Sequence, residues 1–247
     1  MDIDRRYTEL GEFRIHSLHT GRGAPVVLLH GLSGSHRWWR LALPPLAEHF
    51  RVHIPELVGF GGSRPAARQP SIPEMAGVLA GWLDALELER PHVVGHSMGG
   101  QISIHVAARR PERVDRLVLA NAAGIPRDFS LPELARLLAE LMPPRAWGAP
   151  EFLPTIAFDA LRAGPRVLWS AARHLLQDDV RPLLPSIVAP TLLIWGELDP
   201  LIPLEHARLF QEQIPNARLL ILPDAAHTPM ADRSRDFAEA VIAFLRE

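Results

Sequence analysis

The 247-residue chain contains no lysine and no cysteine, so all 26 of its basic residues are arginine. Without lysine it cannot form a Schiff base, complete a phosphate-binding P-loop or use a Ser–Lys dyad. Without cysteine it has no disulfide, no thiol nucleophile, no iron–sulfur cluster and no thiolate zinc site. The chemistry that remains belongs to hydroxyl, imidazole and carboxylate groups, and the chain has 12 histidines to take part in it.

The chain also lacks a large excess of positive or negative charge, because it has 26 basic and 28 acidic residues. This balance argues against a nucleic-acid partner, and the densest basic stretch, residues 109–116, is interrupted by Glu112 and Asp115. No apolar run approaches the ~20 residues of a membrane span. The opening MDIDRRYTEL lacks the apolar stretch of a signal peptide. We therefore expect a cytoplasmic protein without a membrane span.

Short apolar runs bounded by glycine, proline or charge predict strands that are buried on both faces. Helical patterns lie between them, and a more alternating opening, residues 7–18, suits an antiparallel hairpin. Strands that alternate with helices indicate an α/β fold with a mostly parallel sheet covered on both faces. The predicted strands are 26–29, 52–54, 92–94, 116–119, 191–195 and 219–222, and the predicted helices are 73–86, 99–109, 204–213 and 235–245.

The interval 124–188 contains no strand run and is too long for a simple crossover. It is rich in leucine, proline and tryptophan, with helical spacing at 131–141 and 166–176. We interpret it as a helical cap inserted between two strands. The predicted core domain is therefore 1–123 together with 189–247, and the predicted cap is 124–188.

The strongest local signal is GHSMGG at 95–100, which follows a predicted strand and opens a predicted helix. A nucleophile on such a sharp turn needs neighbours without side chains, and Gly95, Gly99 and Gly100 provide them. Ser97 is therefore the predicted nucleophile, placed above the sheet at the N-terminus of a helix.

A serine hydroxyl needs a base, and His227 is the best candidate because it follows the last predicted strand. Strand ends of a parallel sheet gather at one edge, so this loop can reach Ser97. The spacing of His16 and His19 is only weakly typical of metal ligands, and the pair has no obvious third ligand. The same holds for His92 with His96, so we expect no metal site.

The imidazole needs an acid that holds its tautomer and stabilises its cation. Asp199 follows the strand 191–195 through a short turn at the same edge of the sheet, and we favour it. Asn121 follows an earlier strand, but an amide carries no charge. The weaker acidic rivals are Glu197, Asp224 and Asp232.

An anion formed in the reaction needs backbone donors, and the glycine-rich loop at 30–35 follows the strand 26–29. The backbone N–H groups of Leu32 and Met98 are the candidates for an oxyanion hole. The glycine cluster at 59–63 is interpreted as a turn, because a phosphate loop would need lysine. The side chains predicted to line a substrate pocket are Trp38, Trp147, Ile202 and Met230.

In their joint order and spacing these motifs resemble the α/β-hydrolase superfamily over essentially the whole chain. The matching pieces are HG at 30–31, GFGGS at 59–63, GHSMGG at 95–100, GELDPLIP at 196–203 and AHTPM at 226–230. The resemblance implies an eight-stranded, mostly parallel sheet with a helical cap after strand six. It also implies ester hydrolysis through an acyl-enzyme. This mechanism requires no cofactor, and we expect a monomer or a homodimer.

Departures from the family pattern narrow the expected reaction. Ser97 stands where dehalogenases and epoxide hydrolases use aspartate. Carbon–carbon hydrolases usually have Asn before the serine and Trp after the histidine, whereas this chain has His96 and Thr228. The usual DLPGFG motif begins here with Glu56. We expect a carboxylesterase acting on a small-molecule ester, and the alternatives are a carbon–carbon hydrolase, an acyltransferase or perhydrolase, and a ligand-binding protein on a hydrolase fold.

Overall fold

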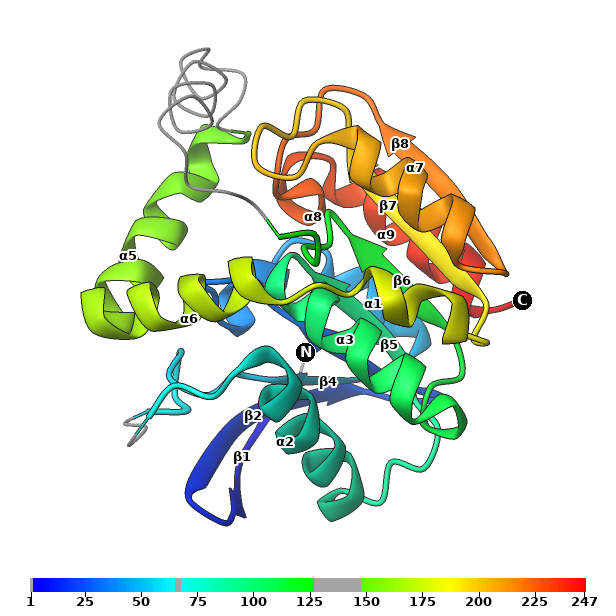
Figure 1. Cartoon of the computed structure of the whole chain (residues 1–247). Coiled ribbons are helices and arrows are strands. Elements are labelled where there is room, and N and C mark those ends of the chain that lie inside the picture. Colours follow the sequence, from blue (N-terminus) through cyan, green and yellow to red (C-terminus); the bar gives the residue numbers. More distant parts are fainter. Residues whose placement is uncertain (1, 65–67, 127–147) are drawn as a thin grey trace.

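A computed structural model describes residues 2–64, 68–126 and 148–247, and its strands form one eight-stranded sheet (Figure 1). The strand order is β1-β2-β4-β3-β5-β6-β7-β8. β2 pairs antiparallel with β1 and with β4, while every other pair is parallel. The strands are β1 Asp4–Leu10, β2 Phe13–Gly21, β3 Pro25–Leu29, β4 Arg51–Pro55, β5 His92–His96, β6 Leu117–Ala120, β7 Thr191–Gly196 and β8 Ala217–Leu222.

This sheet confirms the predicted fold class. Each predicted strand run lies within or overlaps an observed strand, and the opening hairpin turns after Leu10, as its pattern indicates. The central strands β3, β5 and β6 are almost fully buried, which explains why their sequences are apolar without alternation.

Helices cover both faces of the sheet and divide the apolar core into two clusters. One cluster joins the sheet to α2 Ile72–Ala85, α3 Met98–Arg109 and α7 Leu204–Gln213. The other joins it to α1 Leu43–His49, α8 Pro229–Asp232 and α9 Ser234–Leu245. The four helices predicted from spacing correspond to α2, α3, α7 and α9. The short 3₁₀ helices on this core are η1 His36–Trp39 and η2 Pro111–Arg113.

The described part of the interval between β6 and β7 is helical. It contains η4 Pro150–Phe152, α5 Leu153–Ala163, α6 Pro165–Gln177 and η5 Arg181–Ser186. The helix predicted at 166–176 is α6, whereas the one predicted at 131–141 lies outside the described residues. Figure 1 shows α5 and α6 at the left of the view, and η5 packs against α3 and α7. The assignment of 124–188 as a cap stays a prediction.

Within the described ranges, none of the helices combines the length and the apolar character that crossing a membrane requires.

Candidate active site

Ser97 lies at the sharp turn between β5 and α3. Its φ of 51° is in the left-handed region, which a residue with a side chain adopts only under local constraint. The neighbouring glycines make the turn possible, because a Cβ on Gly95 would lie 2.6 Å from the carbonyl oxygen of Gly99. A Cβ on Gly100 would lie 2.5 Å from the Cβ of Ala122. The sequence therefore folds here into the elbow that the GHSMGG motif predicts.

Three predicted side chains, from loops far apart in sequence, meet at this edge of the sheet. His227 Nε2 lies 3.1 Å from Ser97 Oγ, and His227 Nδ1 lies 2.9 Å from Asp199 Oδ2. The loop after β5 carries the serine, the loop after β7 carries the aspartate, and the loop after β8 carries the histidine. This hydrogen-bonded order places a base beside the hydroxyl and a carboxylate beside the base, which is the arrangement that activates a serine.

The carboxylate of Asp199 is buried and held on both oxygens. Oδ1 accepts hydrogen bonds from the backbone N–H groups of Leu201 (2.8 Å) and Ile202 (3.1 Å), and Oδ2 accepts one from Asn121 Nδ2. Burial alone raises the pKa of Asp199, but the neighbouring His227 and these donors outweigh it, so the pKa is lowered. Asp199 therefore stays ionised and fixes a proton on His227 Nδ1.

Two of the alternative acids considered from the sequence, Asp232 and Asp224, make contacts elsewhere. Asp232 shapes the histidine loop, since its carboxylate accepts hydrogen bonds from the backbone N–H of Ala226 (2.9 Å) and from Thr228 Oγ1 (3.2 Å). The Asp224 side chain is exposed and lies beside Arg233.

Asn121 and His96 touch the predicted triad, although sequence reasoning assigned them no role there. The Asn121 side chain also accepts a hydrogen bond from Gly196 N at 3.1 Å, so one amide ties Asp199 to the end of β7. His96 Nε2 lies 2.7 Å from the carbonyl oxygen of His227. Burial lowers the pKa of His96 to about 3, so the ring is neutral and Nε2–H donates. The signal for both was position, since each stands at or directly after the end of a central strand.

The predicted oxyanion loop passes next to the nucleophile. A Cβ on Gly31 would lie 3.0 Å from the Cβ of Ser97, so glycine is needed for this approach. His30 fixes the loop, because its Nδ1 lies 2.8 Å from Gly31 O and its Nε2 accepts the N–H of Leu57 at 3.1 Å. The Met98 side chain is buried in the core, which leaves only its backbone for the predicted role.

The predicted pocket residues lie in different surroundings. Trp38 is buried, with its ring centroid 5.5 Å from that of His96, and Met230 is buried in the cluster under α9. Ile202 is partly buried, and its backbone N–H contacts Asp199. Trp147 lies outside the described residues. Their contact with a substrate stays a prediction.

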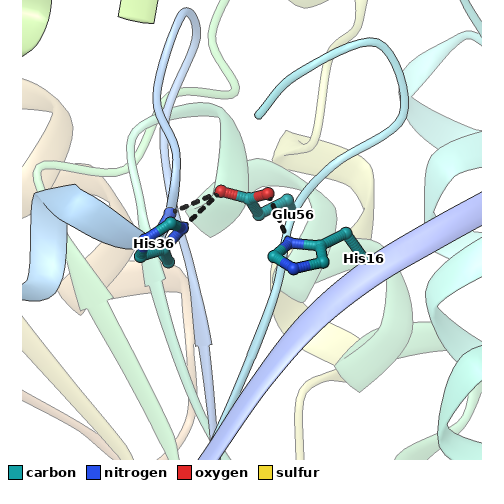
Figure 2. A group of neighbouring side chains, drawn as sticks. All are labelled: His16, His36 and Glu56. Carbon is teal, nitrogen blue, oxygen red and sulfur yellow. Dashed lines mark hydrogen bonds and ion pairs between the residues drawn. The ribbon is translucent and has the colours of Figure 1, made fainter. Parts of the chain in front are cut away.

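A second polar cluster lies where β2, η1 and the loop after β4 meet. His16 Nδ1 and His36 Nδ1 each lie 2.7 Å from a different oxygen of Glu56 (Figure 2). Burial of Glu56 raises its pKa, but the hydrogen bonds from both histidines and from Gly62 N outweigh this, so its pKa is lowered. Sequence reasoning paired His16 with His19 and missed this combination, whose members come from three separate segments.

Comparison with known proteins gives concordant results. The sequence profile of the family described as "alpha/beta hydrolase fold" matches residues 24–177 and 163–234. A 2-hydroxy-6-oxo-2,4-heptadienoate hydrolase of Pseudomonas putida is 33% identical, with 95% of this chain and 92% of that protein covered. The dihydrolipoyllysine-residue acetyltransferase component of the Pseudomonas putida acetoin cleaving system is 31% identical over 91% of this chain, which spans 64% of its length.

Among solved structures, a malate-bound thermophilic esterase from Thermogutta terrifontis has a TM-score of 0.85 at 28% sequence identity. The match covers 98% of each chain.

Proposed function

Because the chain belongs to the alpha/beta hydrolase family, we propose that it is a carboxylesterase for esters of small or medium acyl chains. The observation that carries this proposal is the hydrogen-bonded series Ser97–His227–Asp199 on a sharp elbow beside a glycine loop. The likeness to a solved esterase supports ester hydrolysis as one reaction of this site. No cofactor is needed for this chemistry.

The proposed reaction has two halves. Ser97 Oγ attacks the ester carbonyl while His227 Nε2 accepts the hydroxyl proton, and the backbone N–H groups of Leu32 and Met98 hold the oxyanion. Collapse of the tetrahedral species breaks the bond to the alcohol, which takes the proton from His227. Water then attacks the acyl-enzyme by the same route, releasing the acid and restoring Ser97. Asp199 stays ionised throughout and stabilises the His227 cation.

Turnover of p-nitrophenyl esters of two to eight carbons tests this proposal. We expect the wild type to hydrolyse them and Ser97→Ala to lose at least about 10⁴-fold in kcat. A fluorescent phosphonate should label the wild type at Ser97 and leave Ser97→Ala unlabelled. Absence of wild-type turnover, or full turnover by Ser97→Ala, would overturn the proposal.

Carbon–carbon bond hydrolysis is the second candidate, because a relative 33% identical is named for the hydrolysis of a 2-hydroxy-6-oxo-dienoate. In this chain the positions beside the nucleophile and the base carry His96 and Thr228, and both hold the histidine loop. Parallel assays with a 2-hydroxy-6-oxo-dienoate and with p-nitrophenyl butyrate discriminate the two reactions. A kcat/KM that favours the dienoate would replace the ester proposal with the carbon–carbon one.

Transfer of the acyl group to an acceptor other than water is a further alternative, because it uses the same residues. Addition of alcohol or peroxide to the ester assay, with product partition measured, detects it. Ligand binding without turnover is the third alternative, and an ester that survives many hours with the protein would support it. The cytoplasmic location, the absence of a nucleic-acid partner and the monomeric or homodimeric state stay predictions.

A further inference from the structure

We propose that His16, His36 and Glu56 form a binding site for a divalent transition-metal ion, with Zn²⁺ the best match. Their donor atoms all lie within 4.8 Å of one another, although they come from β2, η1 and the loop after β4. Figure 2 shows the two imidazole rings on either side of the carboxylate, each with Nδ1 turned toward it. The proposal is independent of the ester hydrolysis proposed above.

The donor set favours zinc. Two imidazole nitrogens and one carboxylate are a set that binds Zn²⁺ in proteins, with the fourth position left to water. Each Nδ1 lies 2.7 Å from its own carboxylate oxygen, so one proton stands between each ring and Glu56. A bound ion would displace the proton from each Nδ1 to Nε2 or to water, so that both Nδ1 atoms and one carboxylate oxygen coordinate it.

The carboxylate is held independently of the two rings. Glu56 Oε1 accepts the backbone N–H of His36 at 3.1 Å, and Oε2 accepts that of Gly62 at 2.5 Å. The backbone N–H of His16 donates to Ser63 Oγ, which in turn donates to the carbonyl of Glu56. Each carboxylate oxygen therefore keeps one backbone donor when an ion binds, which is the outer support that orients metal ligands.

The cluster is both buried and reachable. The Glu56 side chain is 1% exposed and that of His16 is 10% exposed, but that of His36 is 22% exposed. In tetrahedral zinc the two nitrogens lie about 3.3 Å apart. We expect the partly exposed His36 ring, rather than the more buried His16 ring, to turn when the ion binds.

Glu56 stands where the family's usual DLPGFG motif has aspartate, and its extra methylene explains how one carboxylate reaches both histidines. Glu56→Asp keeps the charge but withdraws the oxygens from the rings. Glu56→Asp is therefore a sharper test of the site than removal of the carboxylate. If the negative charge alone attracted the ion, Glu56→Asp would leave the affinity for Zn²⁺ unchanged.

The test is Zn²⁺ binding by tag-free, EDTA-treated protein, measured by equilibrium dialysis with elemental analysis. We expect about one equivalent per chain, a rise in Tm of about 5–10 °C at 100-fold excess over Kd, and visible absorption with Co²⁺. Each of three substitutions should lower the affinity for Zn²⁺ by more than the roughly 10–100-fold that the loss of a residue behind a metal ligand costs. The three substitutions are His36→Asn, Glu56→Gln and Glu56→Asp. Circular dichroism verifies that each variant is folded, and His36→Asn changes the most exposed of the three.

Matched controls separate this site from other histidines. His49→Asn changes an exposed histidine at the end of α1 and should leave binding unchanged. His227→Ala removes another histidine–carboxylate pair, that with Asp199, and should also retain the ion. Absence of Zn²⁺ binding by the wild type, or unchanged binding by both His36→Asn and Glu56→Asp, would overturn the proposal.

Discussion

At the scale of single residues, Asn121 contacts the carboxylate of Asp199, the proposed acid of the triad, without carrying charge. Its Nδ2 donates to Asp199 while its Oδ1 accepts from Gly196, so the side chain has no freedom to turn away. A hydrogen bond to a charged group contributes about 1.5–3 kcal/mol. We predict that Asn121→Ala lowers kcat/KM for p-nitrophenyl butyrate by roughly 10–100-fold.

The pH profile tells positioning from general damage in this variant. The Asn121 hydrogen bond is one cause of the lowered pKa of Asp199, so its loss raises that pKa. Protonation of Asp199 then adds to protonation of the base at the acidic limb of kcat/KM, and we expect that limb to move upward. The matched control is Asn216→Ala, which changes the other asparagine, an exposed one, and should leave rate and profile unchanged. An unshifted acidic limb in Asn121→Ala would contradict the assigned role.

His96 contacts His227 in two ways: its Nε2 donates to the backbone carbonyl of His227, and the two ring centroids lie 4.9 Å apart. His96→Phe keeps an aromatic ring but removes the donor, and we predict a loss of about tenfold in kcat with little change in KM. His96→Gln places a donor at similar reach and should recover most of that loss. Equal losses in the two variants would show that packing, rather than the hydrogen bond, is what matters.

The difference between the triad and the Glu56 cluster shows what sequence reveals at this scale. Ser97 is signalled by adjacent glycines, and His227 and Asp199 by their places after strands, so local order is enough. Glu56 meets His36 across 20 positions and His16 across 40, and nothing in the spacing links them. Such contacts depend on how loops fold back, which a pattern along the chain does not encode.

At the scale of elements, helix α5 is hydrogen-bonded to the end of the predicted oxyanion loop and to the start of η1. Asp159 is 3% exposed, and its carboxylate accepts hydrogen bonds from Ser35 Oγ at 2.6 Å and Arg37 Nη1 at 3.1 Å. Ser35 directly precedes η1, so the tie holds α5 against the start of η1. Because Asp159 is buried, the loss of its carboxylate leaves Ser35 Oγ without this acceptor, whereas the partly exposed Arg37 keeps Ser35 Oγ at 3.5 Å.

We predict that Asp159→Ala lowers the free energy of unfolding by about 2 kcal/mol and also lowers kcat/KM. Urea unfolding and the ester assay measure the two effects. Ser35→Ala removes one of the two hydrogen bonds and should fall between wild type and Asp159→Ala. Unchanged kcat/KM in a destabilised Asp159→Ala would show that the tie supports the fold and not the site.

Apolar spacing did not single out α1 or α5, although α5 lies in the interval 124–188 that was predicted to be helical. Pro44, Pro45 and Pro154 stand in the first turn of these two helices, but proline does not by itself hide a helix, since α2 and α6 were predicted and also begin with one. Proline is tolerated there, because the first N–H groups have no partner within the helix. In the four correctly predicted core helices the apolar pattern extends over more turns, so each helix can be identified even where its first and last residues cannot.

At the scale of the whole molecule, the sheet buries several histidines that have no role in the proposed reaction. His19 and His53 contact each other through Nδ1 at 2.7 Å, on strands β2 and β4. Burial, the largest cause, lowers the pKa of His19 to about 4 and that of His53 to about 3. With His96, also at about 3, three imidazoles stay neutral in the fold.

The unfolded chain binds protons on these histidines near pH 6.5, whereas the folded chain does so only near pH 3–4. Their contribution to stability is therefore complete above pH 6.5 and is lost as the pH falls toward 4. With up to three extra protons on these histidines in the unfolded state, their contribution alone should lower the free energy of unfolding by up to about 4 kcal/mol per pH unit. Urea unfolding at pH 7.5, 6.5, 5.5 and 4.5 measures this slope.

His96→Gln should lower this slope by about 1.4 kcal/mol per pH unit, while His49→Gln, at an exposed position, should leave it unchanged. A wild-type stability that is flat between pH 6.5 and 4.5 would show that these rings are protonated in the folded protein.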